Sequence, residues 1–210
     1  MSAAHLNVLR EGAVIPEVVP EQAALTIKGA LRVHYPEFTV FDGAALPRPA
    51  TLKQPDLEYP EADAEATYTI IMADPDLTHQ NDKVSGQVRH WLQRGVKFDA
   101  TSKRAAASTT STVLSDYVPP SPAYLTGKHR YVFIAAKEPV GYTGPLNKDF
   151  PLNGPSDLKD RLRFDTAKYC EEEGLVMEAV GFMRVEADAG AMKDNLALTG
   201  EAIKNAVVGK

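Results

Sequence analysis

Alternating and continuous apolar runs along the chain predict a series of β-strands. Residues 30–35 and 177–186 alternate between apolar and polar side chains, as expected of strands with one buried face. Residues 68–73 form a β-rich apolar run, and residues 128–136 begin polar and continue apolar, which is typical of a buried strand. A further strand is predicted over residues 113–118. The pattern is therefore that of a mainly β protein.

The clearest break in this pattern follows residues 68–73, at Asp74-Pro75, and the apolar run resumes over residues 88–92. Proline fixes its own φ angle and pushes the preceding residue into an extended conformation, so Asp74 is predicted at a rigid strand end. Binding sites are commonly built on loops held by such ends. His79 lies in the polar loop between the two runs, and we expect it to be exposed.

Helices are predicted near the ends of the chain. Residues 5–11 suit a short helix, and a second helix falls between residues 157 and 173, with Ser156 as a plausible N-cap and an end near Gly174. Residues 190–207 are predicted to form an amphipathic C-terminal helix. The residues that recur at helical spacing along the face expected to pack on the core are Met192, Leu196, Thr199 and Ile203.

The remaining segments are rich in proline and glycine. Residues 36–66 contain five prolines, which excludes a long helix and predicts edge strands and turns. Strands do not alternate regularly with helices, which argues against a doubly wound parallel sheet. We expect one domain over residues 1–210, an antiparallel β-sandwich with a few peripheral helices. Gly181, in the last strand, would let another backbone approach closely.

Composition limits the range of functions. The chain has 210 residues and a formal net charge of −5, so it lacks the basic balance of most nucleic-acid-binding proteins. A single cysteine, Cys170, excludes an intramolecular disulfide and suits a reducing compartment. The sequence contains no apolar window long enough to span a membrane and no signal peptide at its start. We therefore expect a cytoplasmic protein.

Three polar residues stand in or at the ends of predicted strands: Asp74, His90 and His129. If they meet in space, the two imidazoles supply N–H donors for an anion, and the carboxylate raises the pKa of both rings. The same carboxylate can accept a hydrogen bond from an ammonium group. The competing interpretation is that His90 is a satisfied core histidine.

Two further chemistries use the same residues. Two histidines and one carboxylate match a non-haem iron triad or an open zinc site, although no short-range ligand pair supports a metal. An Asp–His pair can also orient a general base, with Ser121 as a nearby hydroxyl. Ser121 stands between two prolines, without the glycines of a nucleophile elbow. The residues alone leave these alternatives open, and no phosphate loop or dinucleotide fingerprint is present.

Four short motifs occur in an order that resembles the phosphatidylethanolamine-binding protein family. They are Met72-Ala73-Asp74-Pro75-Asp76, Arg89-His90-Trp91-Leu92, Ser115-Asp116-Tyr117-Val118 and Gly127-Lys128-His129-Arg130-Tyr131-Val132-Phe133. The resemblance extends over residues 14–186 and implies antiparallel sheets with peripheral helices and a small anion pocket at one end. The residues that match the family's pocket and its rim are Asp74, His90, Ser121, Pro122, His129 and Tyr131.

The resemblance also implies a non-enzymatic regulatory role, with no cofactor, no metal and no catalytic residue. In the family the pocket accepts phosphate and phosphorylated head groups such as phosphoethanolamine, and members modulate kinase cascades or inhibit the serine carboxypeptidase called carboxypeptidase Y. An N-terminal extension of about residues 1–24 and the rim at residues 119–122 are most similar to the fungal carboxypeptidase inhibitors. Inhibition of a serine carboxypeptidase is therefore the alternative function, and a hydrolase or metal enzyme the third.

Several positions depart from the family pattern. Thr78 replaces a proline, which predicts a softer turn after the Asp-Pro-Asp motif. Val88 replaces an aromatic residue and removes a flat wall from the pocket. Leu196 stands near the position where some members have a tyrosine at the pocket. We expect these departures to affect the specificity of the pocket for different head groups.

Overall fold

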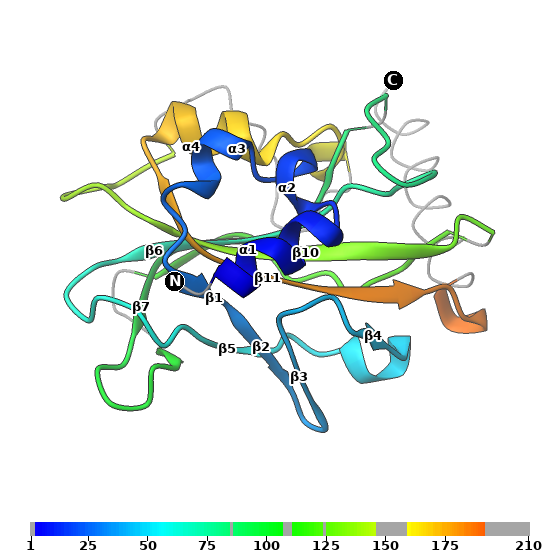
Figure 1. The fold of residues 1–210 in the computed structure, drawn as a ribbon, viewed down its shortest axis with the longest axis horizontal. Coiled ribbons are helices and arrows are strands. Elements are labelled where there is room, and N and C mark those ends of the chain that lie inside the picture. The colour runs from blue at the N-terminus through cyan, green and yellow to red at the C-terminus, as the bar shows by residue number, and fades with distance from the viewer. Residues whose placement is uncertain (1–2, 85, 107–110, 124, 146–158, 192–210) are drawn as a thin grey trace, which may run out of the picture.

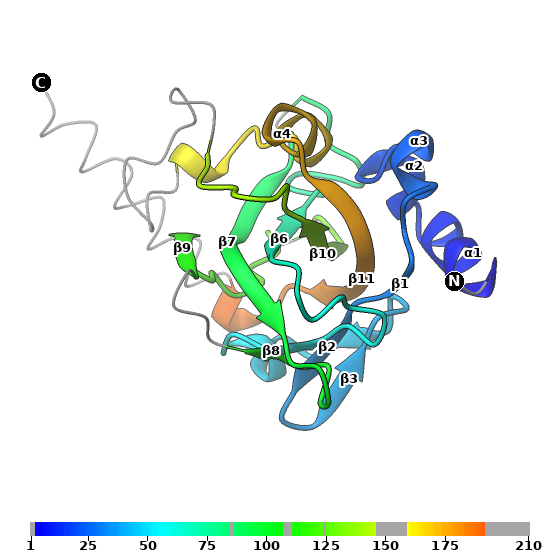
Figure 2. The same ribbon diagram turned by 90° about the vertical axis from the view of Figure 1, so that its left-hand side faces the viewer.

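A computed structural model describes residues 3–84, 86–106, 111–123, 125–145 and 159–191. Its largest element is a sheet that curls into an open half-barrel, with strand order β1-β11-β10-β6-β7-β8 (Figures 1 and 2). β4 pairs with β11 and β9 with β7 outside this order. The strands are β1 (Gly29–Ala30), β4 (Ala45–Leu46), β6 (Tyr68–Asp74), β7 (Val88–Phe98), β8 (Ala105–Ala106), β9 (Thr112–Ser115), β10 (Lys128–Lys137) and β11 (Val176–Glu186).

The pairing directions correct one prediction. The long strands pair antiparallel, but β1 and β4 both run parallel to β11, so the main sheet is mixed. The fold is mainly β with few helices, as predicted, whereas the predicted antiparallel sandwich is not what the main sheet forms. β1 and β4 have two residues each, which is too short for any period in the sequence to reveal them.

A smaller sheet of strand order β3-β2-β5 packs against the inner face of the main sheet. It consists of β2 (Arg32–Tyr35), β3 (Phe38–Val40) and β5 (Asp56–Glu58). Val33 and Tyr35 of β2 are buried, while Arg32 is exposed and His34 half-buried, which confirms the predicted alternation. Val33 joins the core cluster that contains Tyr68 of β6.

The central strands are buried on both faces, so the sheet separates two cores. Along β6, Tyr68 and Met72 belong to the core under the small sheet, while Ile71 belongs to the core on the opposite face. In β11, Ala179 lies in the first core and Met177 in the second. The alternation predicted over residues 177–186 would place both on one face, but a β-bulge opposite Ala135–Ala136 reverses the alternation between them.

Helices cover the second core. They are α1 (Ala3–Glu11), α2 (Val14–Glu17), α3 (Glu21–Ala24) and α4 (Thr166–Glu173), and 3-10 turns lie at Arg48–Thr51 (η1) and Lys159–Arg161 (η2). The N-terminal residues predicted as an extension contribute Leu9, Val14 and Val18 to this core. Over the described residues, no helix has the length and apolar character needed to cross a membrane.

Capping sets the bounds of α4. The Asp165 carboxylate accepts a hydrogen bond from the Lys168 N–H at 3.0 Å, and Gly174 ends the helix with φ 65°. The predicted end is therefore confirmed. The predicted N-cap Ser156 lies outside the described residues, as does the C-terminal helix from residue 192 onward.

Gly181 has the role predicted for it. Gly181 lies in β11, and a Cβ atom added at this position would lie only 2.0 Å from the Leu31 carbonyl oxygen. No side chain fits in this short distance. The neighbouring atom belongs to the backbone of Leu31, which cannot move aside by changing a rotamer. The chain after β1 therefore crosses directly over β11.

We expect Gly181→Ala to lower the free energy of unfolding by about 3 kcal/mol, because the added methyl group must displace the backbone at Leu31. Urea denaturation followed by circular dichroism measures this change. Val176→Ala is the control on the same strand, since this side chain is 42% exposed. A Gly181→Ala protein as stable as the control would show that the close approach is not required.

Candidate functional site

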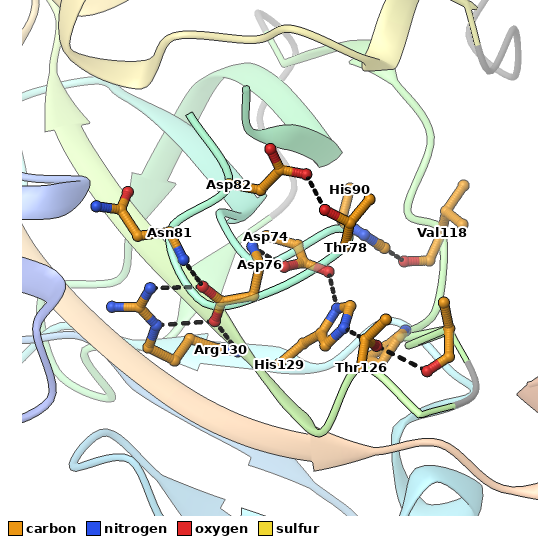
Figure 3. A network of polar contacts seen from close by, with 12 residues as sticks. Asp74, Asp76, Thr78, Asn81, Asp82, His90, Val118, Thr126, His129 and Arg130 are labelled. Carbon is orange, nitrogen blue, oxygen red and sulfur yellow. Dashed lines mark hydrogen bonds and ion pairs between the residues drawn. The ribbon is translucent and has the colours of Figure 1, made fainter. Parts of the chain in front are cut away.

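The candidate site lies at one end of the three central strands. β6 lies between β10 and β7, so Asp74 at the end of β6 is flanked by His129 near the start of β10 and by His90 of β7 (Figure 3). All three side chains are buried, with exposed fractions of 3%, 1% and 6% for Asp74, His129 and His90. The antiparallel register thus brings together residues that are far apart in the sequence.

Asp74 and His129 are in direct contact. His129 Nδ1 lies 2.8 Å from Asp74 Oδ2, and Asp74 Oδ1 accepts a hydrogen bond from the Asp76 N–H at 2.7 Å. The other ring nitrogen of His129, Nε2, lies 2.6 Å from the Thr126 hydroxyl oxygen. Both nitrogens of this ring are therefore engaged within the chain.

His90 is oriented by the segment after β9. Its Nδ1 lies 2.8 Å from the Val118 carbonyl oxygen, and the Val118 N–H donates to the His90 carbonyl at 2.8 Å. A strand was predicted to continue to residue 118, but β9 ends at Ser115 and Val118 holds His90 instead. His90 Nε2 makes no hydrogen bond to any residue that the structure describes.

The pKa of His90 is lowered, which corrects the prediction of a raised value. Burial is the main cause, because it disfavours the charged ring, and the nearby Asp74 carboxylate only partly opposes it. The His90 ring is therefore neutral near pH 7 in the unliganded protein. Since Nδ1 faces a carbonyl oxygen, the neutral ring carries its hydrogen there and presents a lone pair at Nε2.

Tyr131 completes the cluster. Its ring is fully buried and meets the His90 ring edge to face, with centroids 5.1 Å apart. Its hydroxyl group forms no well-aligned hydrogen bond with a described residue, although the Asp74 carboxylate and the Ser121 backbone lie close to it. Burial raises the pKa of this hydroxyl well above its ordinary value, and the Asp74 charge adds to the shift, so Tyr131 remains a donor at all working pH values.

Ser121 and Pro122 lie on the loop beside this cluster, and Arg48 holds that loop. Arg48 Nε donates to the Pro120 carbonyl oxygen at 2.8 Å, and Nη2 donates to Ser121 Oγ at 3.3 Å. Arg48 is only 5% exposed. Sequence reasoning missed it, because an arginine between two prolines in a turn-rich segment gives no signal of burial.

A buried ion pair lies behind the cluster. Arg130 Nε and Nη2 donate to the two oxygens of Asp76 at 2.8 and 2.5 Å, and the Arg130 N–H donates to the same carboxylate at 2.9 Å. Arg130 Nη1 reaches the Ala13 carbonyl oxygen at 2.8 Å and Glu17 Oε2 at 2.6 Å. One guanidinium therefore joins the site to the N-terminal segment.

The pKa of Asp76 is lowered by this pairing. Burial acts to raise it, but hydrogen bonds from the Arg130 guanidinium and from the Asn81 N–H outweigh burial. Asp76 is thus ionised at neutral pH and fully provided with donors.

Thr78 closes the turn that it was expected to soften. Its hydroxyl donates to Asp82 Oδ2 at 2.6 Å, and the Asp82 N–H donates to the Pro75 carbonyl oxygen at 2.9 Å. A hydrogen bond thus replaces the rigidity of the absent proline. Val88 is buried and pairs with Asp74 in the sheet, so this wall is aliphatic. Leu196 lies outside the described residues.

The arrangement bears on the two enzymatic alternatives. Over the described residues no group of His, Cys, Asp and Glu side chains is placed to hold a metal ion. Asp74 and His129 are bonded to each other rather than directed at a common point. The distal nitrogen of this pair faces Thr126 and not Ser121, so the hydrolytic arrangement considered from the sequence does not form in this structure.

The chain therefore combines a curled, mixed sheet with a buried cluster of a carboxylate, two imidazoles and a phenol at one end. The sequence model of the family described as phosphatidylethanolamine-binding protein matches residues 35–180. This match covers more than half of the chain, and the chain belongs to that family.

Relatives in sequence are distant. A 26 kDa secreted antigen of Toxocara canis is 33% identical over 104 residues, which are 50% of this chain and 37% of that protein. An uncharacterised protein of Saccharomyces cerevisiae is 28% identical over 148 residues, which are 67% of this chain and 73% of that protein. The chain thus matches little more than a third of the first relative's length.

Solved structures share the fold. A carboxypeptidase Y inhibitor, crystallised in complex with its cognate proteinase, superposes with a TM-score of 0.72 at 20% identity, covering 90% of this chain and 97% of the inhibitor. A phosphatidylethanolamine-binding protein from Plasmodium vivax gives 0.70 at 20% identity, covering 87% and 97%. At these identities the similarity establishes the fold alone.

Asp76→Asn is expected to lower the free energy of unfolding at pH 7 by about 3 kcal/mol, because the buried Arg130 charge loses its bidentate carboxylate partner and keeps only Glu17. Asp76 has a lower pKa in the folded than in the unfolded protein. Its contribution is therefore complete above about pH 4 and is lost as the pH falls through the folded value. Urea denaturation between pH 3 and 7 measures both effects.

Asp56→Asn is the control for this experiment, since Asp56 is an exposed carboxylate of β5. We expect it to leave both the stability and its pH dependence unchanged. If Asp76→Asn behaves like Asp56→Asn, the buried ion pair does not stabilise the fold.

Proposed function

We propose that this protein is a non-enzymatic regulatory binding protein whose cluster of Asp74, His90, His129 and Tyr131 holds a phosphate-bearing ligand, with Ser121 and Pro122 at the rim. The observation that carries the proposal is the Tyr131 hydroxyl, which is fully buried and forms no well-aligned hydrogen bond with a described residue. Burying such a group without a hydrogen bond is unfavourable by about 1–3 kcal/mol. A ligand oxygen would remove this cost.

His90 supplies the second contact in this proposal. Its Nε2 lone pair accepts a hydrogen bond from a protonated phosphate, or the ring takes up a proton and donates to a phosphate oxygen. In both cases the complex holds one proton that is absent when the protein, with a neutral His90, and a fully deprotonated phosphate are separate. Because burial lowers the pKa of His90, binding is coupled to proton uptake.

Asp74 suits a zwitterionic head group. Its two oxygens already accept hydrogen bonds from His129 and Asp76, but each retains a second lone pair. An ammonium group, as in phosphoethanolamine, can use one of these while the phosphate contacts Tyr131 and His90. The family to which the chain belongs supports this class of ligand.

A second candidate function is inhibition of a serine carboxypeptidase. It is supported by the structural similarity to a carboxypeptidase Y inhibitor that was crystallised with its proteinase. In this chain the N-terminal segment is fixed on the domain and exposes Leu25, whose side chain is 76% accessible. An exposed leucine on a fixed segment is a suitable contact for a partner protein.

Tyr131→Phe is expected to weaken binding of inorganic phosphate at least about tenfold, because it removes a donor to a charged acceptor. The unliganded variant should be as stable as the wild type or more stable, since the lost hydroxyl had no well-aligned partner. Titration monitored by the histidine ring signals in NMR measures affinity, and thermal unfolding measures stability. Unchanged affinity for phosphate would contradict the proposed site.

Tyr59→Phe is the matched control. The Tyr59 hydroxyl is also buried, but it donates to the Glu178 carbonyl oxygen at 3.3 Å in the core. This variant should lose a little stability and bind phosphate as the wild type does. The opposite signs of the two stability changes separate a binding hydroxyl from a structural one.

For the second candidate, the 210-residue chain is expected to inhibit carboxypeptidase Y, and Leu25→Asp should weaken inhibition about tenfold without lowering the melting temperature. Leu52→Asp is the control, because Leu52 is 47% exposed outside the N-terminal segment. Deleting the segment is unsuitable, since it contributes Leu9 and Val14 to the core. Absence of inhibition by the 210-residue chain would exclude this candidate.

A further inference from the structure

The Thr126 side chain contacts the nitrogen of His129 that is not bonded to Asp74. His129 Nδ1 is bonded to Asp74 at 2.8 Å, and Nε2 lies 2.6 Å from Thr126 Oγ1. The same hydroxyl lies 2.7 Å from the Ala123 carbonyl oxygen. Figure 3 shows Asp74, His129 and Thr126 in one line of contacts.

The contact between the Thr126 hydroxyl and His129 Nε2 can form with either ring tautomer of His129. The Thr126 hydroxyl has one hydrogen and two neighbours. If it donates to Ala123, its oxygen accepts from an Nε2–H of His129; if it donates to His129, the ring nitrogen is the acceptor. Thr126 therefore satisfies Nε2 whether or not that nitrogen carries a hydrogen.

The backbone around Thr126 is held in an unusual conformation. Leu125 has φ 70°, in the left-handed region that costs a non-glycine residue about 1–2 kcal/mol. Its side chain is 87% exposed, so burial does not offset this cost. Gly127 follows with φ 88°. Strained loop residues of this kind are concentrated at binding sites and at segments that change conformation.

We propose that Thr126 is an internal competitor for the anion site, a positioning residue that acts through His129. Its hydroxyl holds the place that a ligand oxygen takes on Nε2, and the strained loop allows it to withdraw. The inference rests on the proposed function, and it adds a selection rule. A phosphate or phosphomonoester, with several charged oxygens, contacts Tyr131, His90 and His129 together and displaces Thr126.

Ligands with a single acceptor do not displace Thr126, because one new hydrogen bond only replaces the one that is lost. Thr126 thus lowers the affinity for all anions by a similar factor and leaves phosphate-bearing ligands as those that still bind. A formate ion, with its smaller charge and two oxygens, is the probe for this discrimination.

The test compares Thr126→Val with Thr126→Ser by titration with inorganic phosphate at constant pH. Valine has the shape of threonine without the hydroxyl, so we expect Thr126→Val to bind phosphate about tenfold tighter, the equivalent of one net hydrogen bond. Thr126→Ser should restore wild-type affinity. Thr143→Val, at an exposed position of a distant loop, is the matched control and should not change affinity. Formate should gain by a similar factor and still bind more weakly than phosphate.

A measurement on the wild-type chain gives a second, independent readout of the proposal. Saturation with phosphate must shift the His129 Nε2 signal in long-range 1H–15N spectra, because that nitrogen exchanges Thr126 for a ligand oxygen. If phosphate binds, with shifts at His90, while Nε2 of His129 is unchanged or Thr126→Val binds no tighter, the competitor role is wrong and the proposed function stands. If phosphate shifts no histidine in the wild type or in Thr126→Val, both are wrong.

Discussion

The buried ion pair between Asp76 and Arg130 is the interaction on which the rest of the site depends. Asp76 belongs to the loop after β6, Arg130 to β10, and the remaining donors of the guanidinium reach Ala13 and Glu17. An isolated charge at 2–3% exposure would be strongly unfavourable, so these segments can only be buried together. The backbone N–H of Asp76 then fixes Asp74.

The polar cluster in front of this pair is satisfied almost entirely from within. Asp74 and His129 are bonded to each other, Thr126 to His129, and His90 to the Val118 carbonyl oxygen. Satisfying buried polar groups in this way keeps the unliganded protein stable. The Tyr131 hydroxyl and His90 Nε2 are the exceptions among these described residues, and they mark the point from which a ligand would be held.

The sequence predicted those features that follow from local rules. Pro75 predicted that Asp74 ends a strand, and Gly174 predicted the end of α4. Gly181 predicted the close approach of another backbone. The resemblance to the family singled out the residues that the sheet brings together. The ligand-binding role of these residues stays a prediction.

Other features depend on contacts that no local pattern encodes. β1 and β4 are too short to show a period, so the mixed sheet was not foreseen. The pKa of His90 was expected to rise beside Asp74, but the sequence does not reveal how deeply the ring is buried. Arg48 and Thr126 were missed because arginine and threonine in turn-rich segments are usually exposed.

The position of β11 within the sheet has a consequence for how the chain folds. This strand pairs with β10, β1 and β4, and its Glu178 forms an ion pair with Lys28, which is 150 positions earlier in the sequence. Contacts between such distant residues require closing a large loop, which slows folding. The N-terminal helices also have no complete surface to pack on until β11 is synthesised. During translation Leu9 and Val14 therefore remain unburied, and accessible to chaperones, until β11 near the other end of the chain has been synthesised.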